Sequence, residues 1–275
     1  MTETGSPKFR KPPVSEVVMS IQFEPVVKLT PVHLGRWWQG ERRERYPICE
    51  ERPPLPSVRE DLGKPSAPSF SVTLSGVPPT PALWFLADDR SELLQVQRDR
   101  FSRNWTRPSP DVAEYPSYDN LLPLFEAEFT EFADFLRAED LGSPTAVQCE
   151  LTYINPLPAG QGWEELGQVG NVLAPWSGTY TEGFLSLPED IQINARFRMF
   201  TDDGEPIGRL TTTLQPGWGA DERPVLLFTL TARGRPLSPD VAGAREFLNI
   251  GHRWIVQGFT TLTTPAMHSL WERTQ

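Results

Sequence analysis

The feature that most constrains the fold is a long helix predicted near the end of the chain, from Ser238 to about Leu262. Ser238 is suited to cap its first turn, and Pro239 fits the first helical position, where no amide hydrogen is needed. Apolar residues then recur at helical spacing: Phe247, Leu248, Gly251, Trp254, Ile255, Gly258, Phe259 and Leu262. Glycine inside a helix costs about 1 kcal/mol relative to alanine, so Gly251 and Gly258 indicate close packing against a neighbouring backbone. Such a helix belongs in a core, packed on a sheet.

The order of expected elements along the chain is repeated. Residues 16–23 and 147–153 alternate between apolar and polar side chains, as strands with one buried face do. Each alternating stretch precedes a short helical segment, three β segments and a long helix. Residues 163–173 supply the short helix of the second half, and residues 70–74 supply a strand of the first half.

We therefore expect an α+β fold of two pseudo-repeated β-α-β-β-β-α units, residues 12–142 and 143–275, after a polar tail of residues 1–11. Each unit is expected to hold an antiparallel sheet packed on its long helix, as in helix-grip folds. The two sheets can pair into one and leave a ligand cleft at their junction. The alternative is a single α+β domain whose halves match by chance.

Composition narrows the classes of function. A formal charge of −10 on 275 residues argues against nucleic acid as the partner, because phosphate binding needs a basic face. Neither a signal-peptide core nor an apolar run of membrane-spanning length is present, so we expect a cytoplasmic chain without membrane association. The spacing of Cys49, Cys149 and the three histidines predicts no metal site, and we expect no cofactor. The clustered prolines of residues 50–69 predict a stiff functional loop or a flap.

Two glutamates occupy matching places in the two alternating strands. Glu16 and Glu150 lie on the polar face of each strand. If the two units are related by a pseudo-two-fold axis, these carboxyl groups could face one another, and the pKa of one of them would be raised. The alternative is that both are ordinary strand residues that face solvent or form salt bridges.

A second set of candidate ligand-binding residues lies on the predicted strand of residues 191–199. Its polar face carries Gln192, Asn194, Arg196 and Arg198, a stripe that could hold an anionic ligand or simply face solvent. His252, near the apolar face of the terminal helix, is either a general base or a histidine hydrogen-bonded at the edge of the core.

Three short motifs carry a resemblance to a known family: Pro12 to Val18 with the sequence PPVSEVV, Asp99-Arg100-Phe101 ahead of Asn104-Trp105, and His252-x-x-Ile255-x-x-x-Phe259 followed by Trp271. Together they resemble a sporadically distributed family of uncharacterised bacterial proteins of about this length. The resemblance implies no catalytic residue. The patchy distribution of that family implies an accessory role, on a genomic island or in defence.

The sequence carries no P-loop, dinucleotide-binding glycine pattern or nucleophile elbow, and it favours a binding protein over an enzyme. We expect an interaction protein with a protein partner or a homo-oligomeric state. One alternative is a small-molecule sensor or carrier with a pocket between sheet and helix. Another is a hydrolase that uses Glu16 and Glu150 or His252.

Overall fold

A computed structural model of the chain describes residues 6–63, 80–108, 114–178, 182–219 and 221–275. The strands are β1 (Glu16–Phe23), β2 (Ile48–Arg52), β3 (Ala82–Leu86), β4 (Glu92–Gln97), β5 (Arg100–Thr106), β6 (Ala146–Pro158), β7 (Ile193–Phe200), β8 (Pro206–Trp218) and β9 (Pro224–Gly234). The helices of the described residues are α1 (Pro31–Trp38), α2 (Glu41–Arg45), α3 (Tyr118–Ala138), α4 (Val241–Leu262) and α5 (Pro265–Leu270), and a 3₁₀ turn, η1, spans Val169–Asn171.

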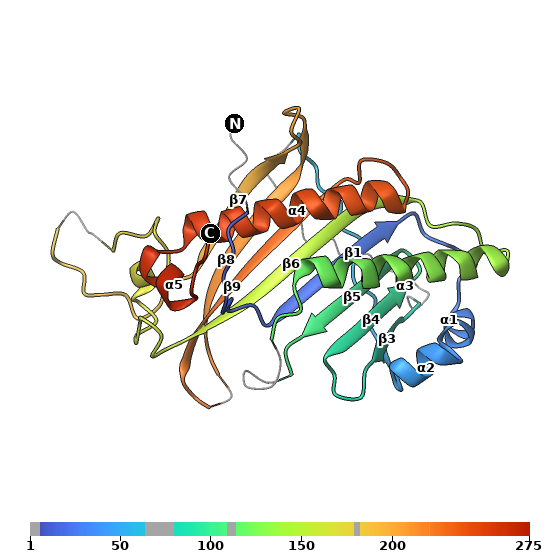
Figure 1. The fold of residues 1–275 in the computed structure, drawn as a ribbon, viewed down its shortest axis with the longest axis horizontal. Helices are drawn as coiled ribbons and strands as arrows, with labels where there is room; N and C mark the ends of the chain where they lie inside the picture. Colours follow the sequence, from blue (N-terminus) through green and yellow to red (C-terminus); the bar gives the residue numbers. More distant parts are fainter. Residues whose placement is uncertain (1–5, 64–79, 109–113, 179–181, 220) are drawn as a thin grey trace.

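All the described strands belong to one antiparallel sheet of nine strands, in the order β2-β3-β4-β5-β1-β6-β9-β8-β7. The first strand of the chain, β1, lies at the centre of the sheet, between β5 and β6. Within β1, Val17 pairs with Trp105 of β5 on one side and with Tyr153 of β6 on the other. Both long helices lie along one face of the sheet, α4 across β6, β9 and β8 and α3 beside it toward β5 (Figure 1).

The expected fold class, two repeated α+β units each with its own antiparallel sheet on a long helix, is wrong. A single large sheet extends through both halves of the described chain, because β1 and β6 pair directly along most of their length. That pairing satisfies the backbone groups along one edge of each strand, which two separate sheets would leave open. The element order along the chain carries no information about which edges meet.

The internal order of the expected units also differs from the structure. Residues 163–173 form only the short turn η1 instead of a helix, and the chain there packs tightly against the loop before β7. A Cβ atom at Gly167 would lie 2.0 Å from the carbonyl oxygen of Pro188. The strand expected at residues 70–74 falls outside the described residues, and β2 was not expected.

Helix α4 matches the sequence prediction closely, although its cap is different. Asp240, rather than Ser238, is the N-cap, and its carboxylate accepts a hydrogen bond from the Gly243 amide at 2.9 Å. The two helix glycines are closely packed, but against side chains, so the predicted contact with a neighbouring backbone is wrong. A Cβ at Gly251 would lie 3.1 Å from the Ala232 Cβ, and one at Gly258 would lie 2.7 Å from a methyl group of Leu210.

The core lies between the sheet and the two long helices. Under α3 it is an aromatic cluster in which Phe132, fully buried, packs against Trp37 and Phe101 with ring centroids 5.4 and 5.5 Å apart. Under α4 the core is mainly aliphatic, with Leu151 and Leu230 contributed by β6 and β9. Aliphatic packing and the two glycines bring α4 close to the sheet.

Candidate functional site

A pocket of about 560 Å³ lies on the helix-covered face of the sheet, where the start of α3 meets the middle of α4. Its inner wall includes Tyr153 and Asn155 of β6, Leu230 of β9 and the α4 residues His252, Ile255, Val256 and Phe259. Tyr115, Ser117 and Tyr118 close the side toward α3. A volume of this size is typical of small-molecule sites.

One wall of this pocket comes from the segment before β1. Residues 6–11, expected to be a polar tail, lie against the last residues of the chain through backbone hydrogen bonds such as Lys11 N to the Trp271 carbonyl at 3.1 Å. Phe9 packs edge-on against Phe259 with ring centroids 5.6 Å apart. The N-terminal segment therefore lines the pocket, and the C-terminal residues hold that segment in place.

A hydrogen-bonded chain of side chains lines the depth of the pocket. The hydroxyl groups of Tyr115 and Tyr153 lie 2.9 Å apart, and the Tyr153 hydroxyl lies 2.9 Å from His252 Nδ1. The imidazole ring of His252 stacks on Tyr118, with centroids 4.0 Å apart and planes 2° from parallel. We call these four residues the tyrosine–histidine cluster.

The tyrosine–histidine cluster is electrically neutral near pH 7. Burial lowers the pKa of His252 to about 4, although the nearby Asp119 carboxylate opposes that effect. Burial also raises the pKa of Tyr115, Tyr118 and Tyr153 well above the ordinary value for a phenol, so all three keep their protons. The depth of the pocket therefore presents aromatic faces and uncharged hydrogen-bonding groups.

The charged residues of the pocket stand at its mouth. Lys8, Arg10, Glu114 and Asp119 line the pocket and are exposed to solvent. Their two positive and two negative charges sum to zero, so the mouth of the pocket favours neither an anionic nor a cationic ligand. The contrast between mouth and depth favours an uncharged ligand.

The direction of the hydrogen bonds in the cluster decides whether His252 Nε2 is a hydrogen-bond donor or an acceptor for a ligand. If the Tyr115 hydroxyl donates to Tyr153 and the Tyr153 hydroxyl donates to Nδ1, the proton of the neutral imidazole is on Nε2. Within the described residues Nε2 has no hydrogen-bond partner. In this direction the ring presents a donor, and in the reverse direction it presents an acceptor. The cluster can thus bind a polar group of either kind by reversing its hydroxyl groups.

The two predicted glutamates lie on the opposite face of the sheet and are not opposite one another. Glu16 stands across from Ile154, and Glu150 stands across from Ser20, four positions along the strand. Glu16 accepts a hydrogen bond from the Asn104 amide at 2.6 Å, whereas Glu150 pairs with Arg233 at 2.5 Å. Each carboxylate has its own partner, as in the salt-bridged alternative.

The predicted polar stripe of β7 shares that opposite face. Asn194, Arg196 and Arg198 alternate with the more buried Ile193 and Met199, and the three polar residues and Gln192 are exposed. The register through β8, β9 and β6 puts Arg198 in line with Arg209, Arg233 and Glu150. Of the predicted ligand-binding residues, only His252 lies on the helix-covered face.

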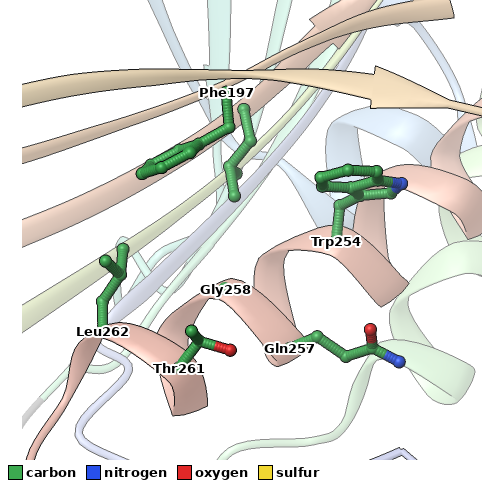
Figure 2. Close-up of a pocket in the computed structure, with 7 residues that line it drawn as sticks. Phe197, Trp254, Gln257, Gly258, Thr261 and Leu262 are labelled. Atoms are coloured by element: carbon green, nitrogen blue, oxygen red, sulfur yellow. The ribbon is translucent and has the colours of Figure 1, made fainter.

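A smaller apolar groove of about 230 Å³ lies beside the first pocket, between the edge strand β7 and α4. Figure 2 shows Phe197 reaching from the strand toward the helix, where Trp254 and Leu262 stand on either side of Gly258. The polar lining side chains are Gln257 and Thr261 of α4. The groove offers little to orient a ligand, and we regard it as a packing seam.

The described residues contain neither a metal-binding cluster nor a membrane-spanning helix. No group of three or more histidine, cysteine, aspartate and glutamate side chains in this part of the chain is arranged to hold a metal ion. Among the same residues, no helix has the length and hydropathy that a membrane span requires.

Sequence reasoning found His252 but missed its tyrosine partners. Tyr153 falls on the apolar side of its strand, where a buried hydroxyl needs a hydrogen-bonding partner. That mismatch was a usable signal. Tyr115 lies in the connection before α3 and Tyr118 is the first residue of α3, and no local pattern relates them to a helix more than one hundred residues later.

No protein-family model matches the chain, and a search of curated proteins gave no significant match. The resemblance to the bacterial family therefore stays a prediction.

Proposed function

We propose that the protein binds a small, uncharged and largely apolar molecule in the pocket between the sheet and α4. The observation that carries the proposal is the tyrosine–histidine cluster, a set of neutral hydrogen-bonding groups at the depth of an aromatic pocket of about 560 Å³. Apolar walls with a few convergent polar groups are the usual design of a small-molecule site. A sensor or carrier of this kind was one of the functions expected from the sequence.

Binding is favoured over hydrolysis by the positions of the candidate residues. Glu16 and Glu150 are each engaged by another side chain, and both lie on the other face of the sheet from His252. A protein partner or a homo-oligomeric state concerns surfaces outside this pocket and stays a prediction.

The test is ligand binding by the wild type and by a variant with a filled pocket. Val256 lines the pocket, so Val256→Trp is expected to occupy its volume, whereas Glu246→Trp adds the same ring on an exposed part of α4. Nile red, an uncharged apolar dye, should gain fluorescence with the wild type and with Glu246→Trp but not with Val256→Trp. Equal fluorescence with all three proteins would overturn the proposal.

A thermal-shift screen with uncharged aromatic compounds then identifies the ligand class. A compound present at one hundred times its Kd stabilises the folded state by about 2.7 kcal/mol. Genuine pocket ligands should raise the Tm of the wild type and of Glu246→Trp and leave that of Val256→Trp unchanged.

A further inference from the structure

The face of the sheet opposite the helices carries a row of polar side chains at right angles to the strands. The register aligns Gln97 of β4 with Arg100 of β5, Arg100 with Gln22 of β1, and Gln22 with Gln148 of β6. The three glutamines are only 3–5% exposed. Buried amides of this kind need hydrogen-bonding partners.

Their partners belong to the connection after β2, and we call residues 55–61 the strap. Gln97 donates to the Leu55 carbonyl and accepts from the Leu55 amide, both at 2.9 Å. Gln148 donates to the Val58 carbonyl and accepts from the Glu60 amide, the latter at 2.7 Å. Each of these two glutamines therefore uses its side-chain amide both to donate to a carbonyl group and to accept from an amide group of the strap main chain.

The middle of the row holds the strap in a similar way. Gln22 accepts from the Val58 amide at 3.1 Å and donates to the Ser57 hydroxyl at 2.6 Å, and Arg100 donates to the Pro56 carbonyl at 3.0 Å. Most of these contacts are to backbone atoms. They require an extended chain but place little demand on its side chains.

One strap side chain is recognised specifically. The Glu60 carboxylate pairs with Arg209 of β8, and both side chains are less than 10% exposed. Arg233 of β9 lies 3.9 Å from the same carboxylate, and Arg209 also donates to the Asp61 carbonyl at 2.8 Å. Arg209 and Arg233 thus form a cationic site beyond Gln148, at one end of the row.

The strap itself buries little apolar surface. Leu55 and Val58 are 41% and 37% exposed, so polar contacts rather than hydrophobic burial hold it on the sheet. Segments with few buried apolar contacts open at low free energy compared with the core. Pro53, Pro54 and Pro56 favour an extended conformation whether or not the strap is bound.

We propose that Gln97, Arg100, Gln22, Gln148 and Arg209 form a binding track for an extended acidic peptide of a partner protein, and that the strap occupies this track until the partner displaces it. The strap shows the chemistry that the track accepts: a proline-containing extended chain whose main chain meets the amides, followed by one carboxylate for Arg209. As a tethered segment, the strap has a high effective concentration, which keeps weak competitors out. The track lies on the other face of the sheet from the small-molecule pocket and is independent of it.

The first test uses a fluorescent synthetic peptide with the sequence of residues 53–62. Val58→Pro removes the amide that Gln22 binds, and Glu60→Ala removes the carboxylate, so the double variant releases the strap. The released protein should bind the peptide at least tenfold more tightly than the wild type. Val58→Ala, which keeps the amide, should behave as the wild type does, and Gln148→Ala added to the released protein should abolish binding. A folded double variant that does not bind the peptide would overturn the proposal, as would equal binding by the wild type.

The second test uses the unaltered protein and does not depend on how the variants fold. The amides of Leu55, Val58 and Glu60 should exchange with solvent through local opening, much faster than core amides of β1 and β6, and added peptide should accelerate their exchange further. Exchange of these amides only through global unfolding would show that the strap is a permanent part of the fold, and the proposal would fail.

Discussion

The two faces of the sheet are built from different chemistry. On the helix-covered face, rings and aliphatic side chains fill the core, and the neutral tyrosine–histidine cluster lines the pocket. On the opposite face, glutamine amides and arginines hold an exposed strap by hydrogen bonds. Apolar burial supplies most of the stability of a fold, whereas polar contacts exchange readily with water and add little net free energy each. The difference implies that the helix-covered face supplies most of the stability of the fold, whereas the strap on the opposite face can be displaced.

The largest effect is expected from the aromatic core. Phe132→Ala should destabilise the protein by about 3–5 kcal/mol, because the ring is fully buried against Trp37 and Phe101. Denaturant unfolding measures this loss. The matched control is Phe184→Ala, which removes a ring that is 93% exposed and should have almost no effect. Similar losses for the two variants would remove the basis of the comparison.

The pH dependence of stability should reveal the neutral cluster. The pKa of His252 is about 4 in the folded protein and near the ordinary 6.5 in the unfolded chain, so the unfolded state takes up the proton first as pH falls. The free energy of unfolding should therefore decrease by about 2–3 kcal/mol between pH 6.5 and pH 4 on account of this residue. The His252→Phe variant retains a ring against Tyr118 but has no group that titrates there. Its free energy of unfolding should therefore lack this decrease, which the wild type should show. Parallel curves would contradict the burial of a neutral imidazole.

A smaller effect is expected within the cluster itself. Tyr153→Phe removes the hydroxyl that joins Tyr115 to His252 and should cost about 1–2 kcal/mol. It should also change the nitrogen chemical shifts of His252, since nothing then fixes which ring nitrogen carries the proton. Tyr118→Phe, which loses only the bond to the exposed Asn249, is the control and should leave the imidazole spectrum unchanged. An unaltered spectrum in Tyr153→Phe would show that the hydroxyl does not orient the ring.

The smallest effect is expected on the strap. Arg59 pairs with Glu24 in an ion pair whose side chains are 61% and 54% exposed. Arg59→Ala should therefore cost less than about 1 kcal/mol, and the cost should fall further at high salt. A salt-insensitive loss above this range would indicate that the strap contributes to the core stability of the fold.

The sequence predicted elements better than their assembly. The alternation that marks β1, β6 and β7 and the helical spacing of α4 depend on neighbours along the chain, and the structure contains each of these elements near its expected position. The pairing of Val17 with Tyr153 joins distant positions and leaves no local pattern, so the sequence favoured two repeated units, each with its own sheet, over one sheet with β1 at its centre. The helix predicted at residues 163–173 is absent, and the short turn η1 lies there, where Gly167 packs against Pro188.

The candidate sites show the same limit. His252 stood out because histidine is rare in this chain, but its partners Tyr153 and Tyr118 come from β6 and from the first residue of α3. The clustered prolines of residues 50–69 predict a functional loop or a flap, and residues 64–69 of that stretch fall outside the described residues. That Gln22, Gln97 and Gln148 bind its residues 55–60 follows only from the order of strands in the sheet.

The central position of β1 has a consequence for how the protein is made. Synthesis delivers β5 before β6, so the pair of β1 and β5 can form while β6 is still missing. During that interval the other edge of β1 exposes a row of unsatisfied amide and carbonyl groups, a template for pairing with other nascent chains. A nascent chain that ends before β6 therefore carries an open strand edge in what becomes the middle of the sheet, and pairing with β6 closes that edge.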